Sequence, residues 1–176
     1  MHSTDSSLLR PALPADIPQI AALERVPEFR NFVGQWSAER HLQTLASPEA
    51  RYFVSEAEQG AIQAFALLRG IQETSRSIEL KRLVVRTPGQ GLGRRIMNEL
   101  MRIVFDQLRA HRMYLDVYED NPRARHLYTS LGFVHEGVMR EAGERGGAFI
   151  SLHLMSTLDR EYRARAGATR PSPSGV

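Results

Sequence analysis

The chain has 176 residues, 42% of them apolar, and a formal net charge of +3 at pH 7, which fits a single domain with a buried core. It has no cysteine, and this excludes disulfides, thiolate metal sites and a cysteine nucleophile. No apolar run reaches the roughly 18 residues that a membrane span requires, and the first residues do not read as a signal peptide. We therefore expect a cytoplasmic protein that does not act at a membrane.

Arginine supplies nearly all of the positive charge, because Lys81 is the only lysine. Arginine stays protonated at any ordinary pH, so a high isoelectric point does not by itself mean a strongly basic surface. The sequence has no basic run with interleaved aromatic residues. Nucleic acid is therefore not an expected partner.

The first half of the chain predicts a strand, two helices and a hairpin. Asp16 and Ser37 are good N-caps, and apolar residues recur at helical spacing after Asp16. Two apolar runs flank a turn at Gln59 and Gly60, a pattern typical of a β-hairpin. The expected elements are a disordered start at 1–7, a strand at 8–11, a helix after Asp16, a helix from 38 to about 46, and strands at 51–56 and 61–70.

Helix and strand patterns alternate in the second half. Residues 91–111 place their apolar side chains on one helical face, and 112–118 alternates strictly between apolar and polar residues. Asn121 and Pro122 begin another helix, which Gly132 ends. This mixed order predicts an α/β fold. The remaining expected elements are strands at 77–86, 133–140 and 148–158, the last two joined through 143–147, and a disordered tail at 164–176.

A glycine-rich loop, residues 89–93 (GQGLG), separates the strand at 77–86 from the helix that follows. Glycine has no Cβ, so a ligand can approach the backbone of such a loop closely. The first N–H groups of a helix have no partner inside it and carry partial positive charge. The loop therefore predicts a ligand that carries phosphate. Three arginines add fixed charge around it: Arg86, Arg94 and Arg95.

Two common phosphate-binding loops fit these residues poorly. A P-loop requires glycine followed by lysine, and the chain contains no such pair. The dinucleotide fingerprint GxGxxG begins at Gly89 and Gly91, but Arg94 occupies the position of its third glycine. The preceding strand alternates charge, unlike a parallel strand that is buried on both faces.

The loop and a later segment together resemble the GCN5-related N-acetyltransferase (GNAT) family. PGQGLGRR is similar to the family's pyrophosphate loop Q/R-x-x-G-x-G/A, although Pro88 stands where Gln or Arg is usual. The resemblance covers residues 8–158. It implies a single domain over 8–160, with a mixed, mostly antiparallel twisted sheet of about six to seven strands and helices on both faces. The later segment matches N-x-x-A-x-x-L-Y-x-x-x-G-F at Asn121, Ala124, Leu127, Tyr128, Gly132 and Phe133.

By this resemblance, the protein is an acetyltransferase that uses acetyl-CoA. A primary amine would attack the thioester directly in a ternary complex, and the acceptor would be a peptide N-terminus, a polyamine or a small-molecule amine. Trp36 and the strand LKRLVV resemble the subgroup that contains ribosomal-protein N-terminal and small-amine acetyltransferases. Family habit also implies a homodimer.

The resemblance also implies how acetyl-CoA is held. The backbone of residues 83–85 would pair with the pantetheine arm, and an N–H of Leu83 or Val84 would stabilise the oxyanion. Backbone N–H groups from Gln90 to Arg95 would cradle the phosphates, and Arg86 would replace the charge missing at Pro88. The implied cofactor-binding residues are Leu83, Val84, Val85, Gln90, Gly91, Leu92, Gly93, Arg94, Arg95 and Asn121.

Three side chains are candidates for proton transfer. The attacking amine must be neutral, and either Glu79 or Asp116, on neighbouring strands, could take its proton. Tyr128 matches the family's tyrosine near the sulfur, where a phenol can protonate the leaving thiolate. A non-catalytic acyl-CoA-binding sensor or docking module would need the glycine loop but none of these groups. Their joint presence favours the enzyme.

The acceptor pocket is expected between residues 26–36 and 140–147. Phe29, Phe32 and Trp36 would line it, although the sequence leaves them equally suited to the core. The histidines show no spacing with carboxylates that would suit metal ligands, so no metal site is expected.

Overall fold

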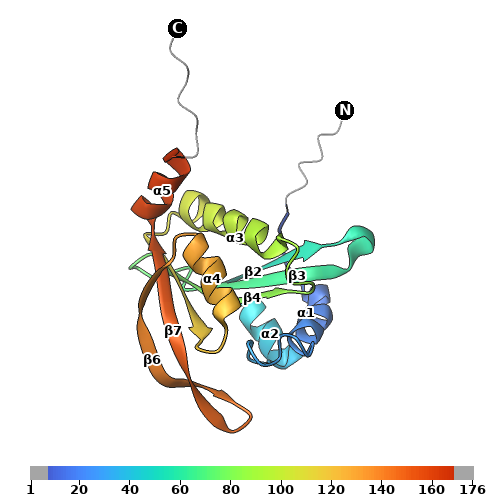
Figure 1. Ribbon diagram of the computed structural model, residues 1–176. Coiled ribbons are helices and arrows are strands. Elements are labelled where there is room, and N and C mark those ends of the chain that lie inside the picture. The colour runs from blue at the N-terminus through green and yellow to red at the C-terminus, as the bar shows by residue number, and fades with distance from the viewer. Residues whose placement is uncertain (1–7, 169–176) are drawn as a thin grey trace, which may run out of the picture.

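The computed structural model describes residues 8–168, so the predicted disordered segment 1–7 and residues 169–176 lie outside the described part. The chain forms one twisted sheet with helices on both faces (Figure 1). The strands are β1 Arg10–Pro11, β2 Ala50–Glu56, β3 Ile62–Arg69, β4 Ser77–Val85, β5 Arg112–Tyr118, β6 Val134–Arg145 and β7 Ala148–Leu158. The helices are α1 Ile17–Glu24, α2 Ala38–Leu45, α3 Leu92–Arg102, α4 Pro122–Ser130 and α5 Asp159–Ala168.

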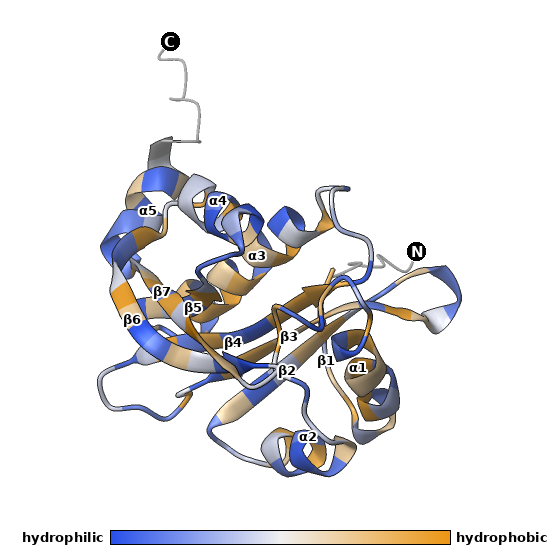
Figure 2. Cartoon of the chain, turned by 60° about the horizontal axis from the view of Figure 1, so that its bottom comes forward, coloured by the Kyte–Doolittle hydropathy of each residue, from blue (hydrophilic) through white to orange (hydrophobic). Residues whose placement is uncertain are grey.

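The seven strands lie in the order β1-β2-β3-β4-β5-β7-β6, and every pair is antiparallel except β4 and β5. This confirms the predicted mixed, mostly antiparallel α/β fold. Helices α1 and α2 cover one face and α3 and α4 cover the other (Figure 2). Each face has its own buried core, one built around Ile20, Leu23 and Phe65 and the other around Ile96, Leu100 and Met113.

The central strands β4 and β5 pair over only a short stretch. Their register runs from Ser77 opposite Arg112 to Glu79 opposite Tyr114. Beyond it β4 continues to Val85 and β5 to Tyr118 without facing each other. The backbone along this edge of β4 therefore has no partner strand, and buried backbone groups need hydrogen-bond partners. The separation creates an opening in the middle of the sheet.

A β-bulge at Lys81 changes which face of the sheet the side chains of β4 point to. Leu67 and Leu68 of β3 lie opposite Arg82 and Leu80, so Lys81 is one extra residue in β4. Leu80 packs in the core beneath α3 and α4, whereas Val84 packs in the core beneath α1. The regular alternation of the sequence gives no sign of this change.

The N-caps of the first two helices behave differently. Ser37 accepts a hydrogen bond from the Arg40 N–H at 3.2 Å, as predicted. Asp16 precedes α1 as expected but does not cap it, since its carboxylate instead accepts from the Leu13 N–H at 2.7 Å and from Arg10 at 2.8 Å. The Arg10 side chain is long enough to reach Asp16 from β1. The same ion pair holds the pKa of Asp16 below its usual value.

Two predicted segments have different bounds in the structure. The expected helix at 91–111 is α-helical only to Arg102 and continues as a π-helix over Ile103–Gln107. The strand predicted to end at 140 extends to Arg145, so the hairpin turn shortens to Gly146 and Gly147. Pairing with β7 explains the extension, because Glu144 lies opposite Phe149.

The prediction of disorder from residue 164 is wrong for its first five residues, because α5 extends to Ala168. Tertiary contacts stabilise this helix, although its residues show no apolar periodicity. The ring of Tyr162 stacks on Phe105 with centroids 4.9 Å apart. Arg165 donates to the Gly132 carbonyl at 3.2 Å and to Thr157 Oγ1 at 2.8 Å. The helix is therefore anchored by contacts with distant segments of the chain rather than by its own periodicity.

Gly132→Ala is expected to lower the free energy of unfolding by about 2 kcal/mol, because an L residue in a left-handed conformation costs on the order of 1–2 kcal/mol. Gly132 has a φ of +88°, and a Cβ there would lie 1.8 Å from Arg165 Nη1 and displace it. Gly147→Ala is the control, since Gly147 has a φ of +82° with no atom within 4 Å of a Cβ. Thermal unfolding should show the larger decrease in Tm for Gly132→Ala. Equal decreases would contradict a role for the Arg165 contact.

Candidate active site

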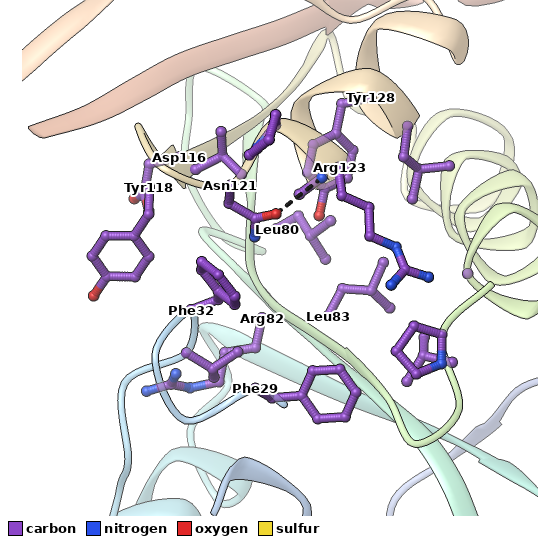
Figure 3. Close-up of a pocket in the computed structure, with 18 of the residues that line it drawn as sticks. Phe29, Phe32, Leu80, Arg82, Leu83, Asp116, Tyr118, Asn121, Arg123 and Tyr128 are labelled. Atoms are coloured by element: carbon purple, nitrogen blue, oxygen red, sulfur yellow. Dashed lines mark hydrogen bonds between the residues drawn. The ribbon is translucent and has the colours of Figure 1, made fainter. Parts of the chain in front are cut away.

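A cleft of about 1130 Å³ lies where β4 and β5 separate (Figure 3). The glycine loop and α4 form one end of the cleft, and the segment between α1 and α2 forms the other. Leu83 and Val85 of β4 line it, as the sequence predicts, together with Val117 of β5. The opening in the sheet therefore borders both the glycine loop and the segment that begins at Asn121, which carry the two family motifs.

The loop end of the cleft suits an anion. Gly89 and Gly91 have φ values of +90° and +76°, and Gly91 is the N-cap of α3, so the loop backbone at the helix start borders the cleft. Arg94 also lines it. Four residues predicted to bind the cofactor are not among the lining residues: Val84, Gln90, Leu92 and Arg95.

Arg123 supplies the positive charge that the sequence reasoning assigned to Arg86. The guanidinium of Arg86 donates to the Ile62 carbonyl at 3.0 Å, and Arg86 does not line the cleft. Arg123, in the first turn of α4, lines the cleft and has Nη2 3.6 Å from the position of a Cβ on Gly89. Arg123 was not predicted as a site residue, although it stands inside the matched segment NPRARHLY. Pro88 itself also borders the cleft.

Asn121 caps α4 and borders the cleft. Its Oδ1 accepts a hydrogen bond from the Ala124 N–H at 3.1 Å, drawn as the dashed line in Figure 3. Pro122 follows at the first helical position, where its missing N–H costs nothing. This local geometry fixes the start of the helix that carries Tyr128.

Tyr128 is buried in the wall of the cleft, with its ring against Phe133 at 5.7 Å between centroids. Its hydroxyl points into the pocket (Figure 3) and has no hydrogen-bond partner among the described residues. Burial, reinforced by the negative charge of Asp116, raises the pKa of Tyr128 well above its usual value. The side chain therefore presents a neutral O–H donor to the cleft.

The two candidate bases lie on either side of Lys81. Lys81 Nζ is 3.1 Å from Glu79 Oε1 and 3.7 Å from Asp116 Oδ2. Asp116 and Lys81 line the cleft, whereas Glu79 does not and also faces Arg69 at 3.9 Å. The structure thus brings both carboxylates to one cation but places only Asp116 at the cleft. Lys81, the only lysine of the chain, was not predicted to lie at the site.

At the other end, Phe29, Phe32 and Trp36 all line the cleft, as predicted. Phe32 is exposed and Phe29 is partly buried. Trp36 is buried and belongs to the core as well, so the two interpretations of this residue both hold. Its indole lies between two guanidinium groups, those of Arg40 at 4.0 Å and Arg82 at 4.3 Å.

A fully buried carboxylate fixes this aromatic segment to the sheet. Glu24 Oε1 lies 3.0 Å from Arg82 Nε, and Glu24 Oε2 accepts from the Trp36 N–H at 2.9 Å. His41 Nε2 lies 3.2 Å from the same carboxylate. A buried charge requires such partners. Desolvation lowers the pKa of Arg82, although Glu24 opposes this shift. Neither Glu24 nor Arg82 was predicted from the sequence to be part of the site.

A sequence model of the acetyltransferase (GNAT) family matches residues 18–133, which is more than half of the chain. The chain belongs to this family. A spermidine N(1)-acetyltransferase of Vibrio cholerae is 31% identical over 119 residues, covering 67% of this chain and 68% of that protein. The family resemblance inferred from the two motifs is thereby confirmed.

Solved structures agree with the sequence comparison. Mutant forms of the spermidine/spermine N-acetyltransferase SpeG from Vibrio cholerae superpose with a TM-score of 0.78 at 27% identity, covering 90% of this chain and 96% of theirs. SpeG in complex with manganese ions gives a TM-score of 0.75 at 26% identity, with coverage of 90% and 95%. The fold of this acetyltransferase therefore extends over nearly the whole chain.

The protein is an N-acetyltransferase, and acetyl-CoA is its co-substrate. The cleft suits this cofactor. A loop with two positive-φ glycines forms one end together with Arg94 of α3 and Arg123 of α4, and β4 has an edge without a partner strand beside it. Within residues 8–168, no helix is long and apolar enough to cross a membrane, and no three metal-binding side chains gather.

Proposed function

We propose that the protein acetylates the primary amine of a small molecule or peptide by direct attack in a ternary complex, with Asp116 as base and Tyr128 as acid. The observation that carries this proposal is that both side chains line one cleft between the glycine loop and the aromatic residues Phe29, Phe32 and Trp36. Soluble substrates of this kind fit a cytoplasmic enzyme. A homodimer remains a prediction from the resemblance.

Acetyl-CoA would lie across the opening in the sheet. Its pyrophosphate would bind the N–H groups of the glycine loop, with Arg94 and Arg123 contributing charge. Its pantetheine arm would pair with the free edge of β4 beside residues 83–85. An N–H of Leu83 or Val84 would then donate to the thioester oxygen as negative charge develops.

The reaction needs three proton transfers. Asp116 would take a proton from the acceptor ammonium, and the neutral nitrogen would form a bond to the thioester carbon. When the tetrahedral intermediate collapses, the C–S bond breaks and Tyr128 would donate its proton to the thiolate. The nitrogen would then lose its remaining extra proton to the Tyr128 phenolate, directly or through water, which restores the acid. The raised pKa of Tyr128 keeps the phenol protonated before the reaction, so its O–H is available to the sulfur as the C–S bond breaks. The products are an amide and free CoA.

Glu79 remains a second candidate for the base. It does not line the cleft, but it holds Lys81 at 3.1 Å beside Asp116. It could act on the acceptor only through an intervening water or through movement of Lys81. We therefore assign it the positioning of Lys81 and propose Asp116 as the group that touches the amine.

The first test of function is thermal stability with acetyl-CoA, free CoA, NADH and ATP. A ligand at about 100 times its Kd adds about 2.7 kcal/mol to the free energy of unfolding, and each kcal/mol raises the Tm of a chain this size by roughly 2–4 °C. We expect acetyl-CoA and CoA alone to stabilise the protein. Stabilisation by NADH alone would contradict the proposed cofactor site, and tight CoA binding without turnover of any amine would favour a sensor.

Arg123→Gln is expected to weaken acetyl-CoA binding about tenfold, because a charge-assisted bond to phosphate contributes roughly 1.5–3 kcal/mol. Arg125→Gln is the matched control, since Arg125 lies on the same helix but does not line the cleft. Titration of each variant with acetyl-CoA gives the two dissociation constants. Equal affinities in both variants would remove Arg123 from the phosphate site.

A further inference from the structure

The carboxylates at the acceptor end of the cleft are already paired with cations of the chain. Asp116 faces Lys81 at 3.7 Å. Asp120 forms an ion pair with Arg145, whose Nη1 donates to Asp120 Oδ1 at 3.3 Å. These pairs leave little uncompensated negative charge where a cationic acceptor would bind.

Glu24 cannot serve as a free carboxylate either. Its side chain has no solvent exposure, and Arg82 and His41 both lie against it. Glu28 is the one acidic residue lining the cleft that has no ion-pair partner among the described residues. Glu28 is a single exposed carboxylate, so it can balance only one positive charge of an acceptor.

The walls around these pairs are largely apolar. Phe29, Phe32 and Val33 line the cleft from the segment between α1 and α2, and Met139 and Leu152 line it from the β6–β7 hairpin. Phe32 stays exposed at the rim. Exposed aromatic side chains beside a cleft provide a surface for an apolar or aromatic group.

We propose that the acceptor is a monoamine with an apolar or aromatic body and no second positive charge, and that Lys81 sets this preference. The inference rests on the proposed function and names its substrate class. The acceptor's amine would approach Asp116, and its body would lie on the aromatic segment. Lys81 would then repel any additional cationic group of the acceptor.

The position of Lys81 gives the physical reason. Its ammonium lies 3.7 Å from Asp116 in the wall of the cleft, where an ammonium of a polyamine would otherwise pair with that carboxylate. Bringing like charges together at a partly buried site is strongly unfavourable. A monoamine needs only Asp116 and can leave Lys81 with Glu79. Spermidine, the acceptor named for the Vibrio cholerae relative, carries several positive charges.

The test is a comparison of kcat/KM for phenethylamine, tryptamine, putrescine and spermidine at saturating acetyl-CoA, followed by release of CoA. We expect the two arylalkylamines to exceed spermidine by at least about tenfold. A kcat/KM for spermidine equal to or above that of the arylalkylamines would overturn the proposal. Acetylation of none of the amines would instead contradict the proposed function.

Lys81→Gln and Lys81→Arg separate the role of the charge from that of the fold. Lys81→Gln removes the cation beside Asp116, so we expect the ratio of kcat/KM for spermidine to that for phenethylamine to rise about tenfold. Lys81→Arg keeps the charge and should leave the ratio as in the wild type. A change in the chemical step that affects both acceptors equally leaves this ratio unchanged. Thermal stabilisation by acetyl-CoA shows whether each variant is folded. An unchanged ratio in Lys81→Gln would overturn the assignment to Lys81.

Discussion

Tyr128→Phe is expected to lower kcat by about 100-fold, the lower end of the usual range for loss of a general acid. The hydroxyl points into the cleft without a partner among the described residues, so its loss removes the proton donor and leaves no other polar group unpaired. The ring keeps its contact with Phe133, so the fold should be preserved. Steady-state release of CoA measures kcat, and ligand-induced stabilisation measures acetyl-CoA binding, which we expect to change little.

Tyr118→Phe is the matched control for this prediction. Tyr118 lines the same cleft, but its ring lies beside Arg145 at the acceptor end. Its hydroxyl has no part in the proposed acid step, so kcat should stay close to that of the wild type. Turnover at wild-type level in Tyr128→Phe would remove Tyr128 as the acid. Because the pKa of Tyr128 is raised, wild-type activity should show no loss from ionisation of Tyr128 near pH 10.

Asp116→Asn is expected to lower kcat/KM by about 100-fold, because the amide cannot take the proton of the acceptor ammonium. The amide keeps the size and shape of the side chain, so the loss reports the missing base. The measurement is kcat/KM for a single monoamine acceptor at saturating acetyl-CoA.

Glu79→Gln serves as the comparison for Asp116→Asn. Glu79 holds Lys81 but does not line the cleft, so we expect a decrease of only about threefold, in keeping with the small contribution of a partly exposed ion pair. A larger loss for Glu79→Gln than for Asp116→Asn would assign the base to Glu79. Small, equal losses would exclude both residues.

Local features of the molecule were predictable from the sequence. Ser37 and Asn121 cap their helices as expected, because a cap depends on a side chain and an N–H only three residues away. Strict alternation gave β5 its correct bounds. The glycine loop and the segment from Asn121 to Phe133 identified the family, and the structure places both at one cleft. Each of these features needs only neighbours along the chain.

The sequence by itself thus determined the fold class, the position of the glycine loop before its helix and the candidates Tyr128 and Asp116. Only the tertiary structure decided that β4 bulges at Lys81 and separates from β5, and that Arg123 rather than Arg86 faces the loop. The tertiary structure also decided which carboxylates at the cleft form ion pairs with lysine or arginine side chains. These outcomes depend on strand register and on long side chains that meet across segments far apart in the chain, where no local pattern records the partner.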